Sequence, residues 1–419
     1  MDQYNQTKLE NGLKVVSILS PNIKMATIQL WIKAGSRYEN EDQKGRAHVL
    51  EHLIFKGSKK FNSNLKISDS IDKYGGYLNA FTGKEGMYLI TQIAEEHIKN
   101  SLDILSDMAI NPMLDKNDLD VEKNVIVEEI ESKQRDYIYR AYNLMMENIF
   151  QSHPLAGIIL GSKDSVLSLN TEKIKEYHNQ YFKPQNSMII ISSSFGHDKV
   201  VEFIKNSEFN KWIGGADDLL KSEDIDNENS EEKREKVIFE KENESKKTFI
   251  RIGYKTKGAK DITGMVALGL VKNFLAYGNS SFLHQKLRDK KGLVYGIGAN
   301  NVVFSDSGVF TIGLDTTKKG ELLDEIKNIS EEILNNLTQE KILEKTKVQT
   351  VGAFIRLISD EINKVKFIGE SFILGKDEIY PEDYIERVKK IGAEDIRRAV
   401  ENYLGPKDSC TVIIGPEKI

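Results

Sequence analysis

The sequence predicts an α+β fold of two related domains, each with helices packed on one face of a sheet. Its 419 residues exceed what one hydrophobic core usually needs, so the length favours two domains. Strand patterns and helix patterns interleave along the chain, and the two halves share a weak internal similarity. A disordered chain is excluded, since 39% of the residues are hydrophobic and only 7 are proline.

The first half of the chain begins with strand patterns. Asn11-Gly12 is a hairpin signal between two short apolar stretches. Apolar and polar side chains alternate over residues 25–34, which predicts a strand with one covered face. The remaining patterns predict helices near 48–55, 65–74, 95–109 and 118–150, and a further strand at 188–193.

A charged segment divides the chain into two parts. Nine acidic and four basic residues lie between Asp217 and Lys236. Such a composition cannot bury enough apolar surface to order itself. We therefore predict an N-terminal domain over residues 1–215, a solvated linker over 216–240 and a C-terminal domain over 241–419.

The two parts resemble each other around their glycines. Gly75 aligns with Gly292 at an offset of 292 − 75 = 217, and Gly86 aligns with Gly308 at an offset of 308 − 86 = 222. An amphipathic helix pattern follows each pair. Two related domains are the economical interpretation.

Charge and cysteine content limit the partners and the compartment. With 59 basic and 64 acidic residues the net charge is −5, which gives no electrostatic case for nucleic acid. Cys410 is the only cysteine, so no intramolecular disulfide can form. The sequence shows no signal pattern and no apolar stretch of membrane-spanning length. We expect a cytoplasmic, bacterial protein with no nucleic-acid and no membrane partner.

The sequence His48-Val49-Leu50-Glu51-His52 carries the clearest chemistry. On a helix His48 and His52 are four residues apart and project from one face, and Glu51 lies on the same side. Two neutral imidazoles suit Zn²⁺, and an adjacent carboxylate can hold a water molecule and accept its proton. A solvated helix face remains the alternative, because a catalytic zinc site needs a third protein ligand.

The long helix predicted at 118–150 offers that third ligand. Glu122 and Glu129 are 129 − 122 = 7 residues apart, so they share a face two turns apart. A glutamate that points inward from such a helix needs a partner. An exposed position is the ordinary alternative for Glu129 considered alone.

His48, His52 and the distant Glu129 resemble the metal-site pattern of the pitrilysin / mitochondrial processing peptidase family, which are inverzincin zinc peptidases. The flanking segments that occur in the order of that family are Gly35-Ser36-Arg37, Phe55-Lys56-Gly57-Ser58, Gly75-Gly76, Asn79-Ala80-Phe81-Thr82 and His153-Pro154-Leu155. The chain length matches the short, two-domain branch. The resemblance implies a processing-peptidase-like fold in which each sheet is mostly antiparallel.

The resemblance also implies roles for the residues of the motif. His48, His52 and Glu129 would be the ligands of one Zn²⁺ per chain, and Glu51 would be the general base. Glu122 would orient a ligand histidine through its second ring nitrogen.

Two further segments resemble substrate-binding parts of the family. Arg288 and Tyr295, seven residues apart in the C-terminal domain, would bind the substrate backbone and stabilise the developing oxyanion. Asn79, Ala80, Phe81 and Thr82 resemble an edge strand to which an extended peptide adds. Arg46 departs from the family, which usually has a small or aliphatic residue there, and puts the local substrate pocket in doubt.

The expected function is a zinc-dependent endopeptidase that hydrolyses oligopeptides or unfolded segments. Because one chain carries both the metal motif and the Arg288/Tyr295 pair, the resemblance implies a homodimer that encloses a clamshell chamber. One alternative is a non-catalytic assembly or core subunit of a larger complex. Another is a leader-peptide maturation protease that works with a second, related subunit.

Overall fold

The computed structural model describes residues 3–214, 235–375, 379–405 and 409–416. These residues form two compact units. The first unit takes its described residues from 1–132, 157–223 and 358–380, and the second takes them from 133–156, 224–357 and 381–419. Residues 216–234 of the predicted linker 216–240 lie outside the described residues. Its last residues are not a linker, because a strand begins at Lys236.

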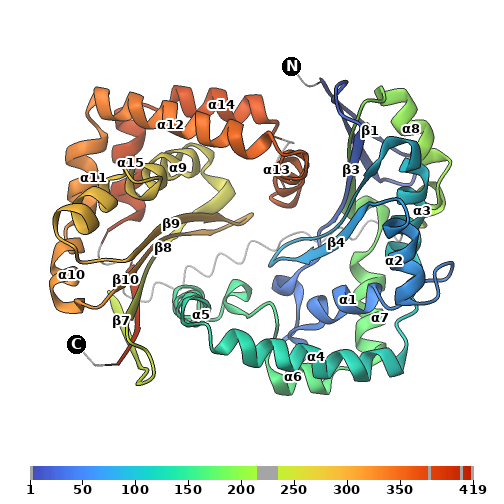
Figure 1. Cartoon of the computed structure of the whole chain (residues 1–419), viewed down its shortest axis with the longest axis horizontal. Coiled ribbons are helices and arrows are strands. Elements are labelled where there is room, and N and C mark those ends of the chain that lie inside the picture. Colours follow the sequence, from blue (N-terminus) through green and yellow to red (C-terminus); the bar gives the residue numbers. More distant parts are fainter. Residues whose placement is uncertain (1–2, 215–234, 376–378, 406–408, 417–419) are drawn as a thin grey trace. The chain divides into compact units, whose positions relative to one another are not determined.

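The first unit is built on a six-stranded sheet with the order β1-β2-β6-β3-β5-β4 (Figure 1). Its strands are β1 (Gln3–Lys8), β2 (Lys14–Leu19), β3 (Met25–Ile32), β4 (Tyr77–Thr82), β5 (Met87–Ala94) and β6 (Ser187–Ser193). β2 and β6 run parallel, and every other neighbouring pair is antiparallel. The predicted hairpin joins β1 to β2, with Gly12 at φ +93° in the turn. β4 lies at the edge of the sheet.

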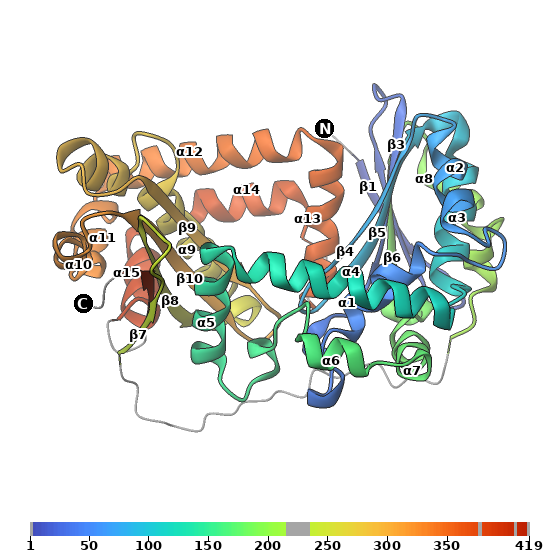
Figure 2. The same ribbon diagram turned by 60° about the horizontal axis from the view of Figure 1, so that its bottom comes forward.

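Helices cover both faces of this sheet. The helices of the first unit are α1 (Arg46–Ile54), α2 (Asn64–Asp72), α3 (Ile98–Ile110), most of α4 (Lys116–Gln134), α6 (Lys163–Ser168), α7 (Thr171–Tyr181), α8 (His197–Lys205) and α13 (Glu361–Ile373). α3 and α8 lie on one face of the sheet and α13 lies on the other (Figure 2).

The strand predicted to have one covered face is buried on both. Ile28 and Leu30 point to one side, and Gln29 and Trp31 on the other side are also buried. Gln29 is satisfied there, since its amide donates to the carbonyl of Ile362 in α13 and accepts a hydrogen bond from the indole of Trp31. Polar residues in a strand therefore do not mark a solvent face when a later helix supplies their partners.

The second unit repeats the architecture with a five-stranded sheet of order β7-β11-β8-β10-β9. Its strands are β7 (Lys236–Lys241), β8 (Thr248–Thr256), β9 (Gly296–Val303), β10 (Gly308–Thr316) and β11 (Ser409–Gly415). β7 and β11 run parallel and the other pairs are antiparallel, as in the strand series β2-β6-β3-β5-β4 of the first unit. The predicted α+β fold of two related domains is confirmed. The prediction that helices pack on one face only is wrong for the first sheet, because α13, from late in the sequence, covers its second face.

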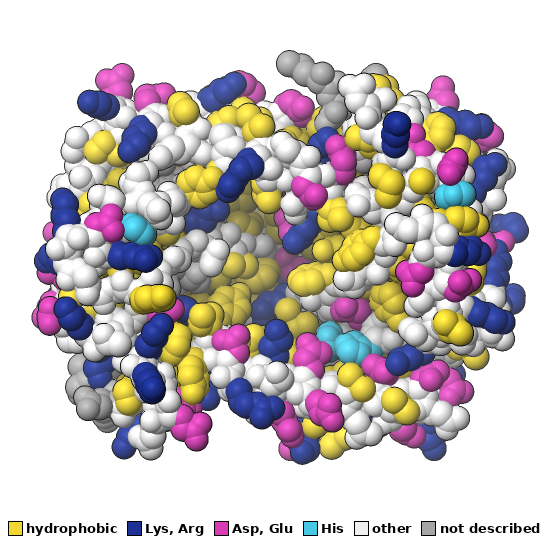
Figure 3. Space-filling view, in the orientation of Figure 1, with side chains coloured by type: hydrophobic (Ala, Val, Ile, Leu, Met, Phe, Trp, Pro, Cys, Tyr) yellow, Lys and Arg dark blue, Asp and Glu magenta, His cyan; other side chains and the backbone are white. Residues whose placement is uncertain are grey.

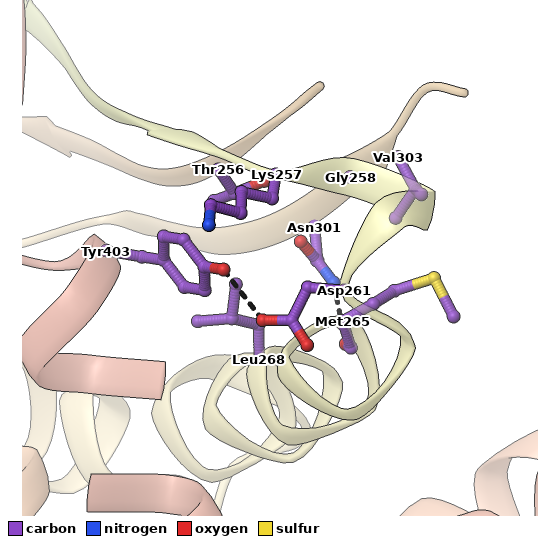
Figure 4. Close-up of a pocket in the computed structure, with 9 residues that line it drawn as sticks. All are labelled: Thr256, Lys257, Gly258, Asp261, Met265, Leu268, Asn301, Val303 and Tyr403. Atoms are coloured by element: carbon purple, nitrogen blue, oxygen red, sulfur yellow. Dashed lines mark hydrogen bonds between the residues drawn. The ribbon is translucent and has the colours of Figure 1, made fainter. Parts of the chain in front are cut away.

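The helices of the second unit are α5 (Tyr137–Phe150), α9 (Ile262–Ala276), α10 (Lys319–Ile326), α11 (Ile329–Leu337), α12 (Glu340–Ile358, of which the last residue belongs to the first unit), α14 (Pro381–Lys390) and α15 (Ala393–Tyr403). α9 begins where Asp261 accepts a hydrogen bond from the Gly264 N–H at 2.9 Å. The second carboxylate oxygen of Asp261 accepts a hydrogen bond from the hydroxyl of Tyr403 at 2.7 Å (Figure 4). This bond connects α15 to the start of α9.

Each sheet receives one covering helix from the other half of the sequence. α13 comes from the second half and packs on β3 and β6, and α5 comes from the first half and packs on β8 and β11. Both contacts require a glycine, because a Cβ on Gly369 would collide with Trp31 and a Cβ on Gly253 would collide with Met145. The two compact units therefore exchange one helix each along the sequence.

None of the described helices combines the length and the apolar composition that crossing a bilayer requires. Basic and acidic side chains are interspersed on the face drawn in Figure 3.

Candidate metal centre

The helix that carries the histidines begins at a buried carboxylate. Glu39 accepts hydrogen bonds from the backbone N–H of Gly45 at 2.9 Å and of Ala47 at 2.7 Å. These are donors that the first turn of α1 leaves free, and Gly45 has the positive φ of +92° that the entry to the helix requires. Burial raises the pKa of Glu39 to about 7. Glu39 thus fixes the start of α1, and sequence reasoning did not single it out.

His48 and His52 meet Glu129 of α4. Their ring centroids are 4.6 Å apart, and the Nε2 atoms lie 3.7 Å (His48) and 3.9 Å (His52) from Oε2 of Glu129. One potential ligand atom from each of the three residues lies within 4.8 Å of the others. The spacing of the motif and the choice of Glu129 therefore correspond to one cluster in space.

The cluster fits a tetrahedral zinc ion. Zinc binds nitrogen and carboxylate oxygen at about 2.0–2.1 Å, so two ligand atoms at the tetrahedral angle lie about 3.4 Å apart. The distances of 3.7 and 3.9 Å from the Nε2 atoms to Glu129 are close to that value. Two imidazoles and one carboxylate are a ligand set of catalytic zinc sites, which leave a fourth position open.

Glu122 holds the other nitrogen of His52. Its Oε2 lies 2.7 Å from Nδ1 of His52, and its Oε1 forms an ion pair with Lys56. Burial raises the pKa of Glu122, but the hydrogen bonds from Lys56 and His52 outweigh burial and leave this pKa below its usual value. The ionised carboxylate favours the His52 tautomer with a proton on Nδ1, so Nε2 is free toward Glu129. Lys56 was not predicted as part of the site.

The side chain of Glu51 extends from α1 to the edge strand β4. The hydroxyl of Thr82 in β4 donates to Oε2 of Glu51. Burial raises the pKa of Glu51, and the hydrogen bond from Thr82 opposes that effect. A carboxylate with a raised pKa is suited to accepting a proton near neutral pH. Thr82, predicted as part of a substrate strand, contacts Glu51 directly.

The other residues of β4 alternate between exposed and half-buried positions. Asn79 and Phe81 are exposed, and Ala80 between them is half-buried. The Asn79 side chain donates to the hydroxyl of Tyr77 at 2.8 Å and its oxygen accepts the N–H of Ala80 at 2.8 Å. β4 pairs only with β5 in the described sheet, so no further strand of that sheet covers its other edge.

Arg46 is buried beside the start of α1. Its guanidinium carbon lies 4.9 Å from the ring centroid of Tyr177, and its Nη2 donates to the carbonyl of Tyr38 at 3.4 Å. Its Nη1 also donates to the side chain of Gln43. The departure at Arg46 put the local substrate pocket in doubt, and the structure places the charge of Arg46 over the buried ring of Tyr177.

Arg288 and Tyr295 lie together in the second unit. Arg288 belongs to a π-helical segment, His284–Lys290, and its guanidinium carbon lies 5.8 Å from the Tyr295 ring centroid. Its Nη1 donates to the Tyr295 carbonyl at 3.5 Å. Tyr295 is 70% exposed, so its hydroxyl is accessible. Lys247, which sequence reasoning missed, also lies over this ring, with Nζ at 4.1 Å from the centroid.

Comparison with known families identifies the chain. Residues 14–163 match the family described as Insulinase (Peptidase family M16), and residues 168–349 match the family described as Peptidase M16 inactive domain. The first match contains the whole cluster of His48, His52 and Glu129. The chain belongs to peptidase family M16.

Relatives of this M16 chain cover its full length. It is 28% identical to the uncharacterized zinc protease YmxG of Bacillus subtilis over 97% of both chains, and 29% identical to an uncharacterized zinc protease of Streptomyces coelicolor over 99% of this chain and 90% of the relative. A crystal structure of a protease from Helicobacter pylori has the same fold, with a TM-score of 0.89, 22% identity and coverage of 99% and 100%. The predicted family and the two-domain branch are confirmed.

The buried histidine gives the metal-free M16 chain a testable pH dependence. Burial lowers the pKa of His48 from 6.5 to about 3, and the charge of His52 contributes to the shift. Between these values the unfolded chain binds a proton that the folded chain does not, so the free energy of unfolding should fall as pH falls below 6.5. The slope for one proton is about 1.4 kcal/mol per pH unit. Urea unfolding in chelator should show this loss in the wild type, and His48→Gln should lack this part of it. Parallel stability curves for the two proteins would contradict the assignment.

Proposed function

We propose that the protein is a zinc-dependent endopeptidase that hydrolyses oligopeptides or unfolded segments. One observation carries the proposal: His48, His52 and Glu129 bring their ligand atoms within 4.8 Å of one another, beside the half-buried carboxylate of Glu51. Membership of family M16 and relatives named zinc proteases support it.

In this proposal His48, His52 and Glu129 hold one Zn²⁺ per chain. A zinc ion at such a site lowers the pKa of a water molecule and polarises a peptide carbonyl. Glu51 accepts the proton of the attacking water, and its Oε2 is oriented by the hydroxyl of Thr82. Glu51 then gives this proton to the leaving amine, so the same carboxyl group acts first as general base and then as general acid.

The substrate would add to the free edge of β4 as an extended strand. Main-chain hydrogen bonds recognise little sequence, which favours flexible peptides over folded proteins. Arg288 would bind substrate carbonyl or carboxylate oxygens, and Tyr295 would donate to the oxyanion. The presence of the metal motif and the Arg288/Tyr295 pair in one chain supports a homodimer with a closed chamber. We place this homodimer in the bacterial cytoplasm.

The first experiment is hydrolysis of a long, internally quenched peptide by the purified protein. Activity should disappear with a chelator and return when Zn²⁺ is added. A folded, zinc-loaded protein that cleaves no peptide would contradict the proposal.

The contact between Glu122 and His52 predicts a separate effect on metal binding. Glu122→Gln should keep the fold but lower zinc affinity about 10-fold to 100-fold, because the amide holds Nδ1 of His52 less strongly and pairs poorly with Lys56. Competition with a fluorescent zinc chelator measures this affinity. The same affinity in variant and wild type would remove Glu122 from the site.

The exposed hydroxyl of Tyr295 predicts an effect on turnover. Tyr295→Phe should lower kcat by roughly tenfold to a thousandfold and leave zinc content unchanged, since only the donor to the oxyanion is lost. Steady-state kinetics on the quenched peptide measures kcat. An unchanged kcat would assign Tyr295 to packing under Lys247.

A further inference from the structure

The second unit contains a cavity that belongs neither to the metal centre nor to the Arg288/Tyr295 pair. It has a volume of about 320 Å³ and is open to solvent. Its walls come from α9, the π-helical segment His284–Lys290, α11 and α12. This volume lies in the range of small-molecule sites.

The lining of the cavity is positively charged. Lys286, Lys290 and Lys345 line it, and none of its lining residues is an aspartate or a glutamate. Lys286 is paired with two glutamates, since its Nζ donates to Glu332 at 2.6 Å and lies 3.4 Å from a carboxylate oxygen of Glu325. Lys290 and Lys345 are exposed and form no ion pair with any residue that the structure describes. They are therefore the two lining lysines whose charge no described carboxylate pairs.

A buried hydroxyl beside the same cavity lacks a partner. Ser281 is 6% exposed, and its Oγ has no hydrogen-bond partner among the described residues. A buried hydroxyl without a partner costs free energy unless a ligand or water satisfies it. The Oγ atom has almost no solvent-accessible surface, so it lies behind the wall of the cavity and does not face its interior.

An aromatic pair forms the apolar part of the wall. Phe274 and Phe282 both line the cavity, and their rings stack with centroids 5.1 Å apart. Both rings keep some exposure to solvent. Apolar walls combined with a few polar groups are typical of sites for small organic ligands.

We propose that this cavity binds a small organic phosphate. The phosphate group is held by Lys290 and Lys345, and the organic part lies against Phe274 and Phe282. Single donors on separate side chains suit the several oxygens of a phosphate, whereas a planar carboxylate is matched best by the fork of an arginine. No arginine lines the cavity.

Phenyl phosphate is the probe that combines the two features, and isothermal titration calorimetry of the zinc-loaded protein measures its binding. The double variant Lys290→Gln, Lys345→Gln should weaken binding about 10-fold to 100-fold. Lys341→Gln is the matched control, because Lys341 is an exposed lysine of α12 that does not line the cavity. It should bind phenyl phosphate like the wild type. Both variants keep the metal centre intact, so weaker binding by the double variant alone would place the ligand in this cavity and not at the metal centre.

Ser281→Ala is a second control, because its hydroxyl is closed off from the cavity. It should bind phenyl phosphate like the wild type while the Tm stays equal or rises, because an unpartnered buried hydroxyl is removed. Benzoate and phenol should bind at least tenfold more weakly than phenyl phosphate. The proposal fails if phenyl phosphate does not bind at millimolar concentration, if phenol binds equally well, or if the double lysine variant binds like Lys341→Gln. None of these measurements depends on peptide hydrolysis.

Discussion

Replacing Glu51 with glutamine should leave the zinc content unchanged and lower peptide hydrolysis by about 10²-fold to 10⁴-fold. The amide keeps the size of the side chain and can still accept the hydrogen bond from Thr82, but it cannot take a proton from water. His48, His52 and Glu129 remain in place, so the metal stays. Steady-state kinetics on the quenched peptide, together with metal analysis of the same sample, measures both quantities.

A control for this variant must also remove a carboxylate. Glu128→Gln is suitable, because Glu128 is exposed on α4, next to the candidate ligand Glu129. It should keep both zinc and activity. Near-normal hydrolysis by Glu51→Gln would mean that another group takes the proton, and zinc loss in that variant would mean that Glu51 is a ligand.

Replacing Glu129 with glutamine should remove zinc and activity together. A neutral amide oxygen is a weaker ligand than a carboxylate, and only two histidines then remain close to the ion. Removal of an outer hydrogen-bond partner costs up to about 100-fold in affinity, so loss of a ligand should cost more than about 100-fold. Zinc competition with a calibrated chelator measures the affinity.

Glu128→Gln again serves as the control, since it makes the same chemical change one residue away on an exposed face. A Glu129→Gln protein that holds zinc as tightly as this control would place the third ligand elsewhere. Restored hydrolysis at saturating Zn²⁺ would instead show that Glu129 contributes affinity alone.

The local part of the site could be predicted from the sequence because it depends on helix geometry. His48 and His52 are four residues apart on one helix, so any helix through them places both rings on one face. Glu129 lies on a different helix, and its residue pattern alone left an exposed position open. The resemblance to a known family selected it, and the distances to His48 and His52 agree.

The supporting contacts could not be predicted because no residue pattern marks them. Glu39 caps α1 from a preceding turn, and Lys56, just after the end of α1, pairs with Glu122 of α4. No periodicity marks a lone glutamate as a cap when it lies outside the usual position just before the helix. No residue spacing marks the π-helical form of His284–Lys290 either.

The helix exchange has a consequence for biosynthesis. The strands of the first sheet are complete once β6 ends at Ser193, but the face with Gln29 and Trp31 waits for α13, which ends at Ile373. The ribosome must add 373 − 193 = 180 further residues in between. At 5–20 residues per second this takes about 9–36 s, during which a nascent sheet exposes an apolar face. Until α13 has been synthesised, this sheet therefore lacks the helix that covers its second face.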